Sequence, residues 1–360
     1  MALVVGGELL WRQKSVPDFD PRALIDAREV SEFRALDQPR MVSGAEADFL
    51  HDDDYVLGLT LNGESRAYPS RFASLHHAIN DQVQGQAVAI TYCSMCGTGV
   101  GLNPTAGGRT LTFDLYGLYY AVAAVYDRET KSVWTPTTGR AILGPLAGTR
   151  LERFPLFDTT WKEWKQLHPD TLVMAPDERF AEHYPPADQP EPRGYPHFPQ
   201  RSMEASVTRG DRRLSPFEKV LGVKVPVPAG AASGADAVAR RAYPIGTLER
   251  EGSVVNDQLA EWPIAVFLEP KSVSATAVSR VLNGRTLTFK GKRLPDGRVE
   301  IYDRETGTRW SLQGRGEAGP LAGQELASVE SHLSAWYGWS AFFPDTSIYR
   351  RDDPPQPFGG

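Results

Sequence analysis

The residues whose types and spacing most directly suggest chemistry are the two cysteines of the chain, Cys93 and Cys96, in the stretch VAITYCSMCGTGVGLNP. Two thiols this close can form a redox couple, half of a metal site, or a pair of inert buried thiols. A structural disulfide is not expected, because so short a loop removes little entropy from the unfolded chain. A thioredoxin-type dithiol places its first cysteine at a helix N-terminus. The glycines and the proline after Cys96 predict no helix there, which favours a metal-binding turn.

A turn of the form C-x-x-C-G lets Gly97 take a positive φ while backbone N–H groups point at the sulfurs. One cysteine pair cannot close a four-ligand zinc site, so the other ligands must be histidine, carboxylate or solvent. His76 and His77 stand shortly upstream in SLHHAIND, where a helix is plausible, and at most one of them is expected to face the site. A Cys2His set leaves an open position for substrate, water or oxygen.

Two thiolates and one imidazole suit copper, zinc or iron, and they do not suit magnesium or calcium. We predict copper, with zinc or iron as alternatives, because nearby tyrosines favour redox chemistry, although these could equally be ordinary strand residues. The predicted metal ligands are Cys93, Cys96 and His77, and the predicted catalytic residues are Tyr92 and Asp127. The other nearby tyrosines are Tyr116, Tyr119 and Tyr120.

The chain also repeats itself. RTLTF begins at residues 109 and 285, YDRET begins at residues 126 and 302, and GPLAG begins at residues 144 and 319. This pattern predicts a duplicated module. The second copy lacks the cysteines: VFLEPKSVSA stands opposite ITYCSMCGTG, and Ser253 stands opposite His77.

Residues that both halves keep are predicted to be scaffold, as for Trp134 and Trp310. Asp127 and Arg128 also recur, as Asp303 and Arg304. Their recurrence in the half without cysteines indicates an ion pair that ties a hairpin, which competes with a catalytic role for Asp127.

Short β-branched or alternating runs separated by glycine and proline turns predict a mainly β (α+β) fold. We expect two duplicated β-rich lobes with short helices, the second lobe degenerate. The predicted strands are residues 55–61, 87–92, 110–115 and 121–126, and the predicted helices are residues 71–80 and 160–168. The predicted domains are an N-terminal extension (1–33), a metal-site lobe (34–180), a proline-rich connector (181–205), a degenerate repeat lobe (206–350) and a C-terminal tail (351–360).

The 360 residues carry a formal net charge of -6, with 39 basic and 45 acidic residues mixed along the chain. No basic stripe suggests a nucleic-acid partner, and no apolar run is long enough to span a membrane. The N-terminus lacks the features of a signal peptide, so a cytoplasmic location is expected, or a periplasmic or extracellular one if a leader was removed.

Five motifs occur in order: RAYPSRFASLHHAINDQ, VAITYCSMCGTGV, AVYDRETKSVWTPTTGRAILGPLAG, TTWKEWKQLHPDT and SAWYGWSAFFPDTSIY. On these motifs the chain resembles the bacterial domain of unknown function family 3179, over about residues 34 to 350. The resemblance maps the family's histidine to His77 and its Tyr-Cys-x-x-Cys-Gly to Cys93, Cys96 and Gly97. Ser94-Met95 replace the usual Pro-Leu, and Ala78 replaces the usual acidic residue. Family members usually carry an export signal, and the resemblance implies no reaction.

The sequence therefore predicts a metalloprotein with an open Cys2His site, a copper-dependent oxidoreductase that acts on a small molecule. One alternative is a copper carrier or chaperone with an exposed cysteine turn. Another is a structural zinc protein without catalysis. The oligomeric state is not predicted.

Overall fold

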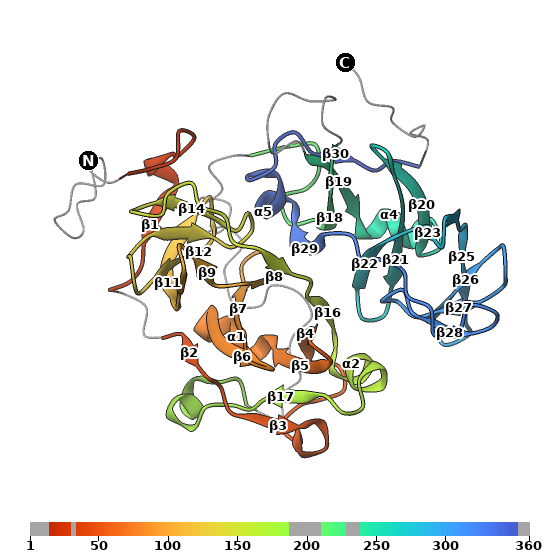
Figure 1. Cartoon of the computed structure of the whole chain (residues 1–360), viewed down its shortest axis with the longest axis horizontal. Coiled ribbons are helices and arrows are strands. Elements are labelled where there is room, and N and C mark those ends of the chain that lie inside the picture. Colours follow the sequence, from red (N-terminus) through yellow and green to blue (C-terminus); the bar gives the residue numbers. More distant parts are fainter. Residues whose placement is uncertain (1–13, 30–33, 187–209, 228–237, 352–360) are drawn as a thin grey trace. The chain divides into compact units, whose positions relative to one another are not determined.

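The computed structural model describes residues 14–29, 34–186, 210–227 and 238–351 (Figure 1). The chain divides into two compact units, each mainly β with a few short helices. Unit 1 comprises Met1–Leu156 and Thr160–Gly210, and unit 2 comprises Phe157–Thr159 and Asp211–Gly360. Most of the predicted connector, residues 187–205, lies outside the described residues. Within the described ranges, no helix is both long and apolar enough to cross a membrane.

The first sheet of unit 1 contains the antiparallel hairpin of β4 and β5, and β17 joins it between β5 and β3. The hairpin turn is Asn62-Gly63, and both residues have positive φ, as a type I′ turn requires. β4 is buried at residues 56–59, and helices α1 and α2 both contact it. The elements are η3 (Gly44–Glu46), β3 (Met41–Ser43), β4 (Tyr55–Leu61), β5 (Glu64–Pro69), α1 (Ser70–His76), α2 (Trp161–Leu167), β17 (Leu172–Met174) and η4 (Glu178–His183). Strand β16 (Phe157–Thr160) lies at the unit boundary, with its first three residues in unit 2.

The second and third sheets of unit 1 carry the cysteines and the hairpin that contacts them. The strand order is β15-β8-β7-β6-β2 in one sheet and β1-β11-β12-β13-β14 in the other. The strands are β1 (Leu24–Asp26), β2 (Leu36–Asp37), β6 (Ala78–Val83), β7 (Gln86–Cys93), β8 (Thr98–Leu102), β11 (Phe113–Tyr119), β12 (Val122–Asp127), β13 (Val133–Thr135), β14 (Arg140–Leu143) and β15 (Arg153–Phe154); η2 (Pro21–Ala23) precedes β1, and β9 (Thr105–Ala106) pairs with β10 (Arg109–Thr110).

Unit 2 is also built from short strands and a few short helices. Its sheets have the orders β29-β18-β19-β30, β20-β21-β22 and β25-β26-β27-β28, with a β23-β24 pair. The elements are β18 (Lys219–Pro226), β19 (Val238–Pro244), α4 (Ile245–Arg250), β20 (Val254–Leu259), β21 (Trp262–Glu269), β22 (Ser274–Ser279), β23 (Val281–Leu282), β24 (Arg285–Thr286), β25 (Phe289–Arg293), β26 (Val299–Asp303), β27 (Arg309–Trp310), β28 (Gly316–Ala318), β29 (Ser331–Ala335), α5 (Trp336–Ser340) and β30 (Ser347–Ile348).

The helix predicted at residues 71–80 is shorter than expected. α1 ends at His76, because His77 takes a left-handed conformation (φ 60°) and its N–H caps the carbonyl of Ala73. The chain then turns directly into strand β6, so Asn80 lies in a strand. The helix predicted at 160–168 is confirmed as α2, with Thr160 at the N-cap. The strand predicted at 110–115 is split, because Leu111 and Thr112 separate β10 from β11.

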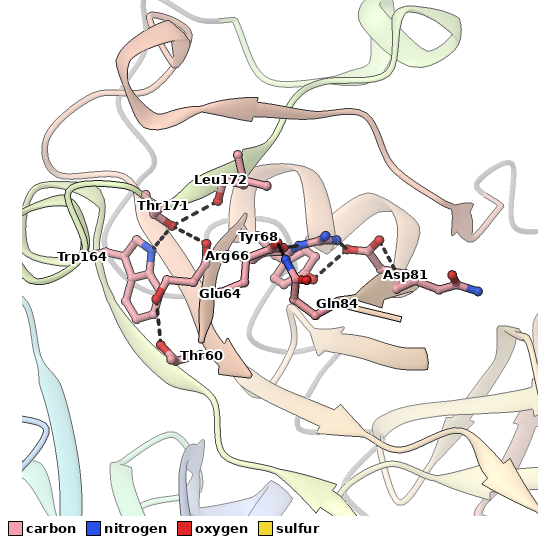
Figure 2. Close-up of polar contacts among 11 residues, drawn as sticks. Thr60, Glu64, Arg66, Tyr68, Asp81, Gln84, Trp164, Thr171 and Leu172 are labelled. Carbon is pink, nitrogen blue, oxygen red and sulfur yellow. Dashed lines mark hydrogen bonds and ion pairs between the residues drawn. The ribbon is translucent and has the colours of Figure 1, made fainter. Parts of the chain in front are cut away.

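Several buried contacts occur once in each unit. The Asp81 carboxylate accepts hydrogen bonds from Arg66 and Tyr68 (Figure 2), and Asp257 does the same with Arg241 and Tyr243. These side chains belong to the scaffold of each unit.

The indole N–H groups of the α2 and α5 tryptophans are held in matching ways. Trp164 donates to Thr171 (Figure 2), and Trp339 donates to Thr346. Trp134 and Trp310, predicted to be scaffold, are both buried and donate to Asp127 and Asp303.

Trp164 packs directly on Gly58 of β4, where a Cβ atom would lie only 2.1 Å from the indole Cζ3. We expect Gly58→Ala to lower the free energy of unfolding by about 1 to 3 kcal/mol, because the buried indole must shift to admit a methyl group. Urea unfolding measures this loss. Gly246→Ala is the control: its Cβ would meet only the end of Arg250 at 3.6 Å, so this helical site tolerates alanine. Equal stability of the two variants would contradict the packing argument.

Candidate functional site

The two cysteines lie on the tight turn between β7 and β8. Cys93 is the last residue of β7, Thr98 is the first residue of β8, and Gly97 between them has φ 60°. The predicted strand-to-strand turn, the glycine conformation and the absence of a following helix are thus confirmed. Both cysteines are free thiols, with Cys93 5% exposed and Cys96 0% exposed.

The sulfur of Cys93 is surrounded by hydrogen-bond donors. The thiol of Cys96 donates to it, and so do the backbone N–H groups of Ala123, Cys96 and Met95. The Ala123 N–H lies 3.4 Å from Sγ and comes from β12, at the start of the neighbouring sheet's hairpin. Hydrogen bonds to a thiolate favour the charged form. The Cys96 thiol and these N–H groups together outweigh burial and lower the pKa of Cys93 to about 7.

The sulfur of Cys96 has the opposite environment. Burial raises the pKa of its thiol well above the ordinary value, and the adjacent Cys93 sulfur raises it further. Its sulfur also lies 3.2 Å from the hydroxyl oxygen of Thr98. The pair therefore consists of one thiol that ionises near neutral pH and one that stays protonated. This is the asymmetry that a nucleophilic thiol and its resolving partner need.

The matching turn of unit 2 holds a carboxylate in place of the Cys93 sulfur. Glu269, opposite Cys93 in the repeat, accepts the backbone N–H of Val299 at 3.1 Å and that of Lys271 at 3.2 Å. Val299 and Lys271 stand opposite Ala123 and Met95. The same backbone donors thus point at an acidic side chain in both units, and a carboxylate that accepts N–H bonds is stabilised as an anion.

The resolving position also has a counterpart in unit 2. Ser272 stands opposite Cys96 and Ser274 opposite Thr98, and the Ser274 hydroxyl donates to Ser272 at 2.7 Å. The turn therefore keeps its shape and its polar contacts in unit 2 while both sulfurs are absent.

His77 lies beside the cysteine strand and holds its end in place. The imidazole Nδ1 donates to the carbonyl of Tyr92 at 3.2 Å, and the Tyr92 N–H donates back to the His77 carbonyl at 3.0 Å. Burial lowers the pKa of His77, so the ring is neutral near pH 7. In unit 2 Ser253 keeps the backbone bond, from the Leu268 N–H, but has no ring.

The predicted Cys2His metal set is assembled only in part. The two sulfurs lie together, but the described residues bring no three histidine, cysteine, aspartate or glutamate side chains into a group that could hold a metal ion. The hydrogen bond between the His77 ring and the Tyr92 carbonyl uses one ring nitrogen. The site thus offers a soft pair of thiol ligands to which the described part of the chain adds no third ligand, and copper remains a prediction.

A family model described as "Protein of unknown function (DUF3179)" matches residues 32–346, which is most of the chain. The chain belongs to this family. The resemblance found in the motifs is thereby confirmed. Searches of curated proteins and of solved structures found no match. Because the description of the DUF3179 family states no reaction, function has to be argued from the geometry of this site.

The other histidines of this DUF3179 protein that the structure describes have other surroundings. His76 bonds the Arg34 carbonyl and the Tyr184 hydroxyl through its two ring nitrogens, and burial lowers its pKa. His168 contacts the Ser65 hydroxyl. His197 lies outside the described residues. Of the adjacent pair, His77 is the one beside the cysteine strand, as the family resemblance implied.

The predicted catalytic residue Asp127 is fully buried at the end of β12. Its carboxylate accepts hydrogen bonds from Thr130, Ser132 and Trp134, all within its own turn. Asp303 makes the same set in unit 2 with Thr306, Thr308 and Trp310.

The predicted ion pair between Asp127 and Arg128 is wrong. Neighbouring residues of an extended chain point in opposite directions, and Arg128 instead pairs with Asp114 at 2.7 Å and with Asp37.

The tyrosines near the cysteines pack against protein groups. The Tyr92 side chain packs against the apolar core of unit 1. The Tyr119 hydroxyl accepts the Asp20 N–H, and the Tyr119 ring contacts Phe19 and Tyr120. Burial raises the pKa of Tyr116 to about 12, so this phenol stays protonated near neutral pH.

Two groups that bear on the interpretation of the cysteine turn were not found from the sequence, one in unit 1 and one in the corresponding turn of unit 2. The first is the Ala123 N–H, which reaches the Cys93 sulfur across 30 residues through the meeting of two sheets. No sequence motif identifies a backbone N–H group as a donor to a distant side chain. The second is Glu269, whose position opposite Cys93 in the repeat was the available signal.

Proposed function

We propose that Cys93 and Cys96 form a thiol–disulfide redox centre, and that this DUF3179 protein is an oxidoreductase of the dithiol type. The observation that carries the proposal is the set of backbone N–H donors on the Cys93 sulfur. In unit 2 the corresponding donors bond to the Glu269 carboxylate, which supports a thiolate at Cys93. An ionised thiol beside a protonated one is the state from which dithiol oxidation begins.

The chemistry of such a centre is a two-electron cycle. Cys93, as the thiolate, attacks an oxidant of the disulfide or peroxide class and forms a covalent bond to it. Cys96 then attacks the Cys93 sulfur, releases the bound group and closes an intramolecular disulfide. Two electrons and two protons pass from the two thiols to the oxidant, and an external thiol reductant reverses the change. The donors on Cys93 stabilise its thiolate both as nucleophile and as leaving group.

The proposal includes the duplication. We infer that the two units are copies of one module, because the buried Asp81 and Asp257 clusters, the Asp127 and Asp303 turns and the anion-binding turns match contact by contact. Only the first copy carries sulfur. Unit 2 then keeps the shape of the turn as a scaffold, with Glu269 as the resident anion.

Counting thiols tests the proposal. The folded protein is treated with a small oxidant such as diamide, then unfolded and alkylated, and its intact mass is measured. We expect both thiols to be lost together, with no dimer, and to return after dithiothreitol. Cys93→Ser and Cys96→Ser variants should close no internal disulfide. A pair that stays reduced with every small oxidant while the protein is folded would overturn the proposal.

Copper at Cys93, Cys96 and His77 is the second candidate, and the two adjacent soft ligands favour it. A bound copper ion would supply redox or oxygen chemistry, but the fit is incomplete because no third ligand joins the sulfurs among the described residues. The metal content of the same untagged protein decides between the candidates. One copper per chain that disappears in Cys93→Ser, Cys96→Ser and His77→Ala would support the metal site. A metal-free protein with a reversible disulfide would support the dithiol.

A further inference from the structure

The dithiol proposed above is almost sealed from solvent. Cys93 is 5% exposed, Met95 between the cysteines is 7% exposed, and Cys96 is not exposed at all. Tyr120 and Ala121, which form the β11–β12 turn just before Ala123, are also buried. An oxidant must therefore reach Cys93 through a very small opening, and Cys96 cannot meet an oxidant before Cys93 does.

The two classes of oxidant differ in the space they need. A disulfide is attacked with three sulfurs nearly in line, and each substrate sulfur carries a carbon chain or a protein behind it, so the rate depends strongly on access. A hydroperoxide offers a bare terminal oxygen. From these requirements we infer that the oxidant of the Cys93–Cys96 pair is a small hydroperoxide rather than a disulfide-bearing partner. This inference rests on the proposed function and specifies its substrate class.

The proposed reaction has two nucleophilic steps, the first at a peroxide oxygen and the second at the Cys93 sulfur. The Cys93 thiolate attacks the terminal oxygen of ROOH, the O–O bond breaks, and Cys93 becomes a sulfenic acid while RO⁻ departs. RO⁻ takes the proton of the Cys96 thiol, whose sulfur is in hydrogen-bond contact with Cys93. The Cys96 thiolate then attacks the sulfenic sulfur, the disulfide forms, and the released hydroxide takes a proton from solvent. Overall, two thiols and ROOH give a disulfide, ROH and water, and a small external dithiol restores the thiols.

The sealed position of Cys96 suits this sequence. A sulfenic acid open to solvent is captured by other thiols or oxidised further. Here the Cys96 sulfur is already in hydrogen-bond contact with Cys93, so the intramolecular reaction has a short path. The same burial excludes a protein thiol from the intermediate.

The experiment compares the rates at which the Cys93–Cys96 disulfide forms in the 360-residue protein, folded and unfolded in urea, at one pH. Hydrogen peroxide and glutathione disulfide are the two oxidants. For each oxidant, the rate constant in the folded protein is divided by that in the unfolded protein. Both ratios contain the same change in the thiolate fraction of Cys93, so their quotient measures how much folding restricts access of glutathione disulfide relative to hydrogen peroxide. We expect folding to disfavour glutathione disulfide relative to hydrogen peroxide by about 100-fold or more. Cys96→Ser treated with hydrogen peroxide should gain one oxygen at Cys93, which dimedone traps.

The outcomes separate the two proposals. The peroxide assignment is wrong, and the dithiol proposal stands, if the folded-to-unfolded rate ratio is the same for glutathione disulfide as for hydrogen peroxide. The same conclusion follows if dimedone traps nothing in Cys96→Ser. If no oxidant closes the folded pair, both are wrong. Cys93→Ser controls for oxidation elsewhere, because it should show neither closure nor a dimedone adduct.

Discussion

We expect alkylation of Cys93 by iodoacetamide to rise with pH along a titration whose midpoint lies at about 7, below the ordinary value of 9.0 for a thiol. Only the thiolate reacts, so the rate follows the ionised fraction and falls by about tenfold per pH unit below the midpoint. Near pH 7 about half of Cys93 is ionised, against about 1% of a thiol with a pKa of 9. Burial slows the reaction at every pH, so the midpoint and not the rate tests the prediction. Intact mass and peptide mapping assign the label.

Matched variants at Cys96 test the cause of the lowered pKa. The Cys96 thiol is the largest contributor, so Cys96→Ala should raise the midpoint toward 9, while Cys96→Ser, which keeps a donor, should leave it nearer 7. The remaining lowering in Cys96→Ala measures the backbone N–H groups of Ala123, Met95 and residue 96. A midpoint near 9 in the unaltered protein would contradict the donor environment. Identical midpoints in the serine and alanine variants would show that the thiol of Cys96 has no part in it.

The hydrogen-bond donors around Cys93 bear on the choice between a metal site and a dithiol. From the sequence, a dithiol was disfavoured because no helix follows Cys96, and indeed none does. The turn itself supplies what a helix N-terminus would, namely backbone N–H groups directed at one sulfur, and β12 adds one more. Residue types and spacing identified the pair and its turn. They could not reveal donors that depend on how two sheets meet.

The histidine shows the same limit. Its loss together with the cysteines in the second half was visible in the sequence and suggested a shared metal. In the structure the His77 ring instead bonds to the carbonyl of Tyr92, the residue before Cys93. This contact gives His77 a role in holding the cysteine strand that needs no metal. The spacing of the sequence predicted that the histidine lies near the cysteine strand. It could not predict the partner of a ring nitrogen, because that depends on the left-handed conformation of His77 at the end of α1.

Much of the fold could be predicted because local patterns agree with it. The strand predicted at residues 55–61 is confirmed as β4 with the same bounds, and its apolar run and the following Asn-Gly turn explain why. The partners of charged residues could not be predicted. Arg128 reaches Asp37 and Asp114, and Asp127 is occupied by its own turn, since strand geometry separates adjacent side chains.

Removal of the Asp81 carboxylate should strongly destabilise unit 1. Asp81 accepts hydrogen bonds from Arg66 at 2.6 Å and from Tyr68 at 2.8 Å, all three being buried (Figure 2). Asp81→Ala leaves a buried guanidinium without this partner, and loss of one member of a buried ion pair costs about 3 to 5 kcal/mol. Hydrogen exchange should then show lost protection in β5, β6 and β7. Protection unchanged in these strands would contradict the prediction.

Asp257→Ala is the matched control in unit 2, because Asp257 bonds Arg241 and Tyr243 in the same way. We expect a similar loss of stability, now with exchange in β19, β20 and β21. The effect on the thiols should differ: β6 pairs directly with β7, so Asp81→Ala should expose Cys96 to alkylation, while Asp257→Ala should leave the Cys93 midpoint unchanged. Equal exposure of Cys96 in both variants would mean that the two units do not unfold separately. The contrast between the two variants thus separates the buried carboxylates that stabilise each unit from the cysteines that we propose carry the chemistry of unit 1.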